Sequence, residues 1–281
     1  MSKPVLVGVV QAAAVPGGIE ENIATLHRLV ARAAEQGAGV VVTPELFATG
    51  YAPATAWQWD GAEIRGRLAG LARELNVAVV ASTIDSPGDG ARDPSCRQGE
   101  DARPARYIAA SFFTPEGEEL IRVHKRHLFG AAEKEFITPG RDYAAPFEWE
   151  GWRWGMGICY DVEFPEFARS QAVAGAQVLL VPTAVPELEF RMPGRAEAWG
   201  YSATATSTLQ VPARALENGV FIAYANHCGP GFTGHSCVAT PFGRNAVLLP
   251  GGESVAVIEI DVEAVDSARN LNVYLDDLPA R

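Results

Sequence analysis

The feature that most restricts the fold of this chain is the alternation of short apolar runs with longer amphipathic segments. Residues 4–11 form a run rich in β-branched side chains, which suits a buried strand. Residues 22–36 then carry apolar side chains at helical spacing, and residues 37–43 form a second buried strand. Buried strands that alternate with helices predict an α/β fold.

The same pattern continues along the chain. A helix predicted over 60–76 begins with Asp60 as its N-cap and Glu63 as the partner in a capping box. Residues 106–114 and 118–124 are predicted to form a hairpin, and residues 86–104 a long surface loop. Further strands are predicted at 77–83, 152–158, 177–183, 220–226, 235–240, 245–249 and 254–261, with a helix at 212–218.

Length and composition favour one domain. The 281 residues are 48% hydrophobic and 20% charged, which is enough apolar material for a large core. No shift in composition marks a linker. We therefore expect a single domain over 1–281, with its core at about 4–261 and a short polar tail at 262–281.

The negative charge of the chain restricts the classes of partner that we expect it to bind. Its formal charge is −11, and its lysines and arginines form no cluster that would bind phosphates, so nucleic acids and anionic membranes are not expected partners. The N-terminal residues lack the long apolar region of a signal peptide. No apolar stretch approaches the roughly 18 residues that a membrane helix needs. The protein is expected to be cytoplasmic.

The cysteines indicate neither a disulfide scaffold nor a metal site. Cys96, Cys159, Cys228 and Cys237 are too sparse for a disulfide framework. The pairs His227-Cys228 and His235-x-Cys237 contain zinc-ligand residue types, but their spacing matches no closed tetrahedral site. Alternate residues of a strand also point to opposite faces. We expect no metal.

One cysteine stands at a position suited to a nucleophile. Cys159 follows a predicted buried strand and precedes a predicted helix. The positive end of a helix favours a thiolate over a thiol. The alternative is a small buried apolar residue, which is the usual role of a free cysteine.

Two charged residues also follow predicted strands. Glu45 stands just beyond the strand at 37–43, and Lys125 ends the second strand of the hairpin. Ligands collect at strand ends in α/β sheets. Taken singly, each charge is equally well explained as a solvated side chain. His124 and His127 beside Lys125 fall on opposite faces of a strand, which argues against a metal there.

These three residues and the motifs around them resemble the nitrilase superfamily of carbon–nitrogen hydrolases. The resemblance runs from residue 4 to about residue 261 and rests on several motifs in one order. It implies an α-β-β-α sandwich, in which two mixed β-sheets are flanked by helices, and a homodimer or higher homo-oligomer. The matching motifs are PELFATGY, HKRHLFG followed by Glu133 and PG, GICYDVEFPE, VLLVPTA, ARALENGVFIAYAN and GHSCVATPFG.

The resemblance also implies roles for individual residues. Cys159 corresponds to the nucleophile, Glu45 to the general base and Lys125 to the cation that stabilises the tetrahedral intermediate. Glu133 corresponds to a second carboxylate near the lysine, because it lies six residues before Pro139; Glu135 is the nearby competitor. Lys125 and the backbone N–H of Tyr160 are the expected oxyanion donors. Neither a metal nor a cofactor is required.

The residues after the cysteine point to a substrate class. Nitrilases proper usually have Cys-Trp-Glu, whereas this chain has Cys159-Tyr160-Asp161, which resembles the amidases and carbamoylases. Hydrolases of N-carbamoyl amino acids tend to have two arginines next, where this chain has Val162 and Glu163. We therefore expect an amidase that converts a small neutral carboxamide to an acid and ammonia through a thioester. The alternatives are an N-carbamoyl amine or amino acid amidohydrolase, a nitrilase and a noncatalytic member of the family.

The expected substrate pocket is less well defined by the sequence. We predict that it is lined by residues near the strand ends and by the segment 184–211, which contains Trp199 and Tyr201 and is longer than usual for the family. The alternative for that segment is an exposed interface loop. The predicted pocket residues are Tyr51, Glu163, Thr183, Ala184 and Trp199.

Overall fold

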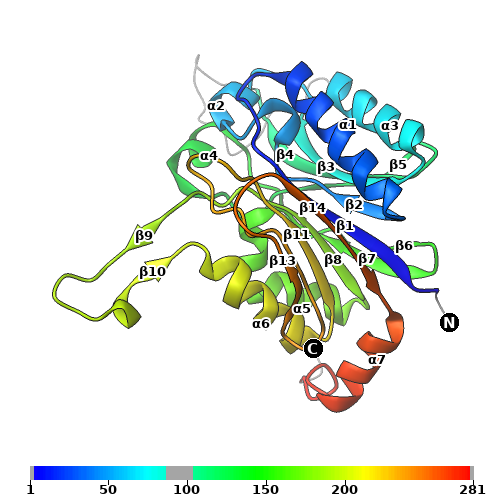
Figure 1. Cartoon of the computed structure of the whole chain (residues 1–281), viewed down its shortest axis with the longest axis vertical. Helices are drawn as coiled ribbons and strands as arrows, with labels where there is room; N and C mark the ends of the chain where they lie inside the picture. Colours follow the sequence, from blue (N-terminus) through cyan, green and yellow to red (C-terminus); the bar gives the residue numbers. More distant parts are fainter. Residues whose placement is uncertain (1–2, 87–103, 279–281) are drawn as a thin grey trace.

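The computed structural model describes residues 3–86 and 104–278. Two six-stranded sheets lie face to face, and helices cover their outer faces (Figure 1). The first sheet has the order β14 (Ser254–Ile260), β1 (Val5–Gln11), β2 (Val40–Val42), β3 (Ala78–Asp85), β4 (Tyr107–Phe113) and β5 (Glu119–His124). The second has the order β13 (Asn245–Leu248), β12 (Cys237–Ala239), β11 (Phe221–Ala225), β8 (Val178–Pro182), β7 (Trp152–Met156) and β6 (Phe147–Trp149).

Both sheets are mixed. In the first sheet β1, β2 and β3 run parallel, and β14, β4 and β5 are antiparallel to their neighbours. In the second sheet β7, β8 and β11 run parallel, and β6, β12 and β13 are antiparallel. The predicted sandwich of two mixed sheets is confirmed.

Three apolar layers hold the sandwich together. The central layer lies between the sheets and includes the buried Trp152 and Trp154 of β7. A second layer packs α1 (Ile19–Glu35) and α3 (Ala62–Leu75) on the first sheet. A third packs α5 (Pro165–Val173) and α6 (Val211–Asn218) on the second sheet. Because the parallel strands are covered on both faces, they read as continuous apolar runs.

Two predictions about helices were wrong. Residues 262–281 do not form a polar tail throughout, because α7 (Val262–Leu271) buries Val265 and Ala268 and is capped by Asp261. The helix α3 begins at Ala62 without the predicted capping box: the Asp60 carboxylate accepts from Ala62 N, and Glu63 completes no reciprocal bond. The predicted loop 86–104, including Cys96, falls almost entirely outside the described residues.

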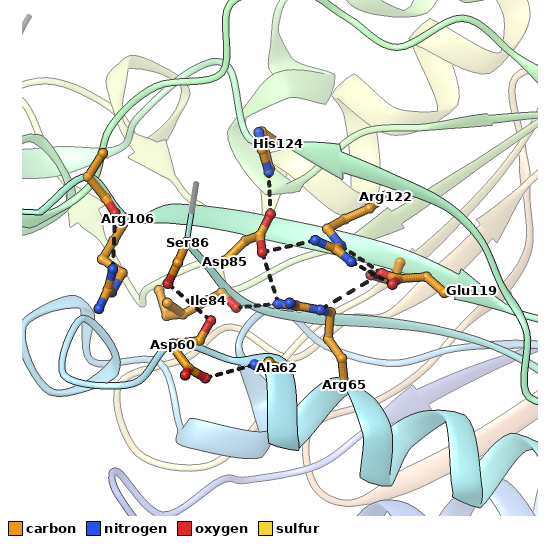
Figure 2. Close-up of polar contacts among 12 residues, drawn as sticks. Asp60, Ala62, Arg65, Ile84, Asp85, Ser86, Arg106, Glu119, Arg122 and His124 are labelled. Carbon is orange, nitrogen blue, oxygen red and sulfur yellow. Dashed lines mark hydrogen bonds and ion pairs between the residues drawn. The ribbon is translucent and has the colours of Figure 1, made fainter. Parts of the chain in front are cut away.

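A cluster of charged side chains anchors the end of β5 (Figure 2). Asp85, at the end of β3, accepts hydrogen bonds from His124 at 2.8 Å and from Arg122 at 3.0 Å, and Arg65 of α3 lies 3.0 Å away. Burial alone would raise the pKa of Asp85, but the His124 hydrogen bond and the two arginines outweigh it and lower the pKa to about 2. The cluster fixes the residue that immediately precedes Lys125.

Within the two described ranges, no helix has the length and apolar character needed to cross a membrane.

Candidate active site

The three predicted catalytic residues come together between the two sheets. Glu45 follows β2 and Lys125 follows β5 of the first sheet, whereas Cys159 follows β7 of the second. Lys125 Nζ donates to Glu45 Oε1 at 2.8 Å and to Glu133 Oε1 at 2.7 Å. All four side chains are buried. The hydrogen bonds from the ammonium group to both carboxylates offset part of the cost of burying these charges.

The structure also shows which of the two candidate carboxylates, Glu133 or Glu135, contacts Lys125. Glu133 points inward from α4 (Gly130–Phe136): its Oε1 accepts from Tyr51 Oη at 2.5 Å as well as from Lys125, and its Oε2 accepts from Phe129 N at 2.8 Å. Glu135, two residues further along the same helix, is exposed. The spacing from Pro139 therefore identified the carboxylate that contacts the lysine.

Cys159 sits on a tight turn. Its φ is 48°, in the left-handed region that non-glycine residues rarely adopt, and it begins the 3-10 turn Cys159–Glu163 ahead of α5. The preceding Gly157 has no room for a side chain, because a Cβ atom there would lie 2.3 Å from Phe167 Cζ. The Sγ atom accepts a hydrogen bond from Ala184 N at 3.5 Å. The turn thus presents the sulfur toward the ends of β7 and β8.

The protonation states differ from the expectation for Cys159. Burial and the nearby Glu45 raise the pKa of the thiol, so the resting cysteine is a thiol rather than the predicted thiolate. The helix-end effect is outweighed because desolvation of a fully buried group is the larger contribution. Burial raises the pKa of Glu45 to about 7 against the opposing charge of Lys125. Burial tends to lower the pKa of Lys125, but the adjacent carboxylates of Glu45 and Glu133 raise it overall.

Glu45 is held by the second sheet although it follows a strand of the first. Its N–H donates to Thr183 O at 3.1 Å, and its carbonyl accepts from His227 Nε2 at 2.6 Å. Burial lowers the pKa of His227 to about 4, so the ring is neutral and carries its proton on Nε2. The free oxygen of Glu45, Oε2, has no hydrogen-bond partner among the described residues. This oxygen is available to take up a proton.

Sequence reasoning missed two residues that position the site. His227 was considered only as a zinc ligand, although it immediately follows the YAN motif. Asp161 was used only to separate family branches, yet its Oδ1 accepts from His127 N at 2.9 Å and its Oδ2 from Ile158 N at 3.1 Å. Asp161 therefore ties the segment after Lys125 to the turn that carries Cys159. The signal for Asp161 was its place in the motif GICYD.

A small pocket opens beside Cys159, with about 320 Å³ of space that includes its mouth. Glu163 and Ala184 line it, as predicted. Tyr51 and Thr183 lie outside the lining: the Tyr51 hydroxyl is bonded to Glu133, and the Thr183 hydroxyl donates to Tyr224 Oη at 3.0 Å. The other lining residues are mostly apolar or aromatic: Phe129, Cys159, Tyr160, Val185, Pro186, Leu188, Tyr201 and Ala203.

The prediction that Trp199 lines the pocket was wrong. The strands β9 (Glu189–Phe190) and β10 (Tyr201–Ser202) pair antiparallel and form an arm that projects from the body (Figure 1). Trp199 belongs to the 3-10 turn just before β10, where it is 60% exposed. Tyr201, on the returning strand, reaches the pocket. The arm thus contributes part of the pocket wall and part of an exposed surface.

Comparisons with known proteins show the family to which the chain is related. The family model for carbon-nitrogen hydrolase matches residues 6–270. A Pseudomonas protegens protein described as a hydrolase in the pqqF 5′ region is 31% identical, with 93% of this chain and 85% of that protein covered. The 2-oxoglutaramate amidase of Bacillus subtilis is 29% identical, with coverage of 90% and 88%.

Solved structures show the same fold. A double mutant of the amidase from Nesterenkonia sp. AN1 in complex with acrylamide has a TM-score of 0.79 and 32% identity, with 98% of this chain and 94% of that chain covered. Other structures of that amidase contain butyramide, or carry the acetamide moiety of fluoroacetamide on the active-site cysteine. Family match, fold and motif order agree, and the chain therefore belongs to the carbon–nitrogen hydrolase family, within the nitrilase superfamily of hydrolytic enzymes.

Proposed function

We propose that this amidase hydrolyses a small neutral carboxamide to a carboxylic acid and ammonia, through a thioester on Cys159. The observation that carries the proposal is the buried contact of Lys125 with Glu45 and Glu133 beside the Cys159 pocket. Butyramide and acrylamide in the similar amidase support a small uncharged substrate.

The protonation states define the first step. Because Cys159 rests as a thiol, a base must remove its proton as the sulfur attacks the amide carbon. Glu45 is that base, since its Oε2 is free and its raised pKa of about 7 makes it a competent acceptor near neutral pH. The attack forms the C–S bond and moves charge to the carbonyl oxygen.

Lys125 and the backbone N–H of Tyr160 stabilise that oxygen. Donors of this kind lower the barrier by on the order of 3 kcal/mol each. Glu45 returns the proton to the leaving nitrogen, the C–N bond breaks and ammonia departs. Glu45 then removes a proton from water, which attacks the thioester and releases the acid and the thiol. Glu133 keeps Lys125 in place through their 2.7 Å contact.

The pocket disfavours substrates that carry a carboxylate. No lysine, arginine or histidine is among the residues that line it, and it contains the carboxylate of Glu163. Burial of an unpaired anion costs several kcal/mol. We expect neutral amides to exceed N-carbamoyl amino acids of similar bulk at least about tenfold in kcat/KM, a difference of about 1.4 kcal/mol.

Ammonia release from a panel of carboxamides, ureas, nitriles, N-carbamoyl amino acids and 2-oxoglutaramate tests the substrate class. The proposal fails if the carboxylated compounds are the better substrates or if only nitriles react.

Covalent labelling tests the nucleophile. Fluoroacetamide should add its acetamide moiety to Cys159, and Cys159→Ala should abolish turnover. Cys228 is the matched control, because it has the same 5% exposure as Cys159. Cys228→Ala should retain both labelling and turnover. A Cys159→Ala enzyme with a tenth of the wild-type rate would rule out the thioester mechanism.

A further inference from the structure

The residues that line the Cys159 pocket include one charged side chain, Glu163. Glu163 lies four residues after Cys159, at the end of the same 3-10 turn, so its position relative to the sulfur is set by the backbone of that turn. Glu163 and Cys159 line the same pocket, which places the carboxylate near the reacting sulfur. A carboxylate at this position interacts electrostatically with the part of the substrate that extends from the amide group.

The charge of Glu163 is not neutralised by a direct ion pair. In the part of the chain that the structure describes, no lysine, arginine or histidine forms a salt bridge with it. The neighbouring Gln210 side chain opposes the rise in the pKa of the carboxylate. The charge of the nearby Arg214 opposes the rise in the pKa of Glu163, but Arg214 forms no ion pair with that carboxylate. Its guanidinium donates to the backbone oxygen of Glu163 at 2.9 Å and pairs with Glu217 at 3.1 Å.

The rest of the pocket suits a cation. Phe129, Tyr160 and Tyr201 supply three aromatic rings, and the Phe129 and Tyr160 rings meet edge to face at 5.3 Å. Aromatic faces attract ammonium groups through their quadrupole, and the attraction grows as water is excluded. Burial raises the pKa of Glu163, and an ammonium group beside it would oppose that rise by stabilising the ionised carboxylate.

We propose that Glu163 is a specificity residue that binds an ammonium group on the substrate, so that carboxamides with an amino group on the tail are preferred over uncharged amides of equal size. This inference rests on the proposed amidase function and refines its substrate class: uncharged amides are hydrolysed, and amides with an ammonium group on the tail are hydrolysed faster. The amide carbon lies at Cys159, and the tail passes the aromatic rings to reach Glu163. A carboxylate at the same end of the tail is repelled.

Three compounds of nearly equal length test the proposal: 3-aminopropanamide (cationic), butanamide (neutral) and succinamate (anionic). We expect kcat/KM to be at least about tenfold higher for the cationic amide than for the neutral one, because a charge-assisted hydrogen bond is stronger than the contact that a methyl group makes at the same position. Longer pairs, 4-aminobutanamide with pentanamide and 5-aminopentanamide with hexanamide, find the tail length at which the ratio is greatest. The inference is overturned if no cationic amide exceeds its neutral partner.

Variants then assign the preference to one side chain. Glu163→Gln should reduce the cationic-to-neutral ratio at least about fivefold and raise the anionic-to-neutral ratio. Glu166→Gln is the matched control, since Glu166 is an exposed glutamate three residues later, and it should leave both ratios unchanged. An unchanged ratio in Glu163→Gln would overturn the assignment.

The ratio of kcat/KM for cationic over neutral amides in the wild-type enzyme tests the proposed preference even if Glu163→Gln does not fold. If none of the compounds releases ammonia, the proposed function fails. If butanamide is hydrolysed but 3-aminopropanamide and its longer analogues are not preferred, only the present inference fails.

Discussion

Lys125 Nζ lies 2.7 Å from Glu133 Oε1, and both side chains are completely shielded from solvent. Glu133 receives three donors, from Lys125, Tyr51 and Phe129. It has no hydrogen to offer, so a carboxylate fits this position and an amide does not. The contact joins α4 to the end of β5 and sets the direction of the ammonium group.

We therefore expect Glu133→Gln to fold but to lose most of its activity, by about 10²-fold, because the new NH₂ group meets a donor and displaces Lys125. Steady-state kinetics and thermal unfolding would measure both effects. Glu135→Gln, on the same helix with an exposed side chain, should keep wild-type activity. Full activity in Glu133→Gln would contradict a positioning role.

Lys125→Ala tests whether the positive charge of Lys125 takes part in catalysis. If Lys125 stabilises the developing oxyanion, its loss should lower kcat and kcat/KM together by about 10²–10³-fold. The two remaining buried carboxylates will also repel each other, so the unfolding midpoint should fall. A change confined to KM would show that Lys125 only binds substrate.

The acid limb of the pH–rate profile should reflect the ionisation of the Glu45 carboxyl group. Glu45 accepts a proton only when ionised, and its pKa is raised to about 7, so kcat/KM for a neutral amide should rise with pH through about 7. His227 cannot produce this limb because its pKa is lowered to about 4. Values of kcat/KM measured between about pH 5 and pH 9 would show whether the acid limb has this pKa. A profile that is flat down to pH 5 would contradict a base with a raised pKa.

His227 should act through the backbone of Glu45. His227→Leu removes the donor to the Glu45 carbonyl, which costs about 1–3 kcal/mol and lets the carboxylate shift. We expect kcat to fall about tenfold or more with little change in KM. His227→Gln, whose amide also donates, should recover part of the loss. A kcat within twofold of wild type in the leucine variant would remove His227 from the positioning residues.

The arm of residues 189–202 should affect specificity through one of its three aromatic residues. Tyr201 lines the pocket and Trp199 is exposed, so Tyr201→Ala should change the ratio of kcat/KM for butanamide over acetamide several-fold. Trp199→Ala should leave that ratio unchanged. A changed ratio in Trp199→Ala together with an unchanged ratio in Tyr201→Ala would show that Trp199, and not Tyr201, lines the pocket.

Asp85→Asn should destabilise the protein without touching the pocket (Figure 2). It leaves Arg65, Arg122 and His124 without their common carboxylate, which costs about 1–3 kcal/mol. Because the pKa of Asp85 is lowered from 3.8 to about 2, its contribution is complete above its unfolded pKa and is lost as pH falls toward 2. Urea unfolding at neutral pH and near pH 3.5 should therefore show a smaller difference between wild type and variant at the lower pH. An equal difference at both pH values would contradict the charge-based account.

Much of the fold and of the candidate site was predictable because the signals are local. Strand positions follow from short apolar runs, and Glu45, Lys125 and Cys159 each stand directly after such a run. The motif order then identified the family and the sandwich. The helix α7 was missed because a single turn-to-turn pair, Val265 and Ala268, supplies its buried face, which is too little periodicity to distinguish it from a polar tail. The predicted pairing of subunits and the Tyr160 backbone donor stay predictions.

The sequence by itself determined the residue types of this site and the order in which they are delivered by strands. The tertiary structure decided what each of them contacts: it brought His227 to the carbonyl of Glu45 and Tyr201 to the pocket, and it left Trp199 at the outer end of the arm. It also decided the protonation of Cys159: the local helix end and the charge of Lys125 favour a thiolate, but burial between the two sheets and the nearby Glu45 outweigh them and favour the thiol. Propensity and spacing act over a few residues, while burial and electrostatics depend on groups that are far apart in the chain and meet only when both sheets are packed.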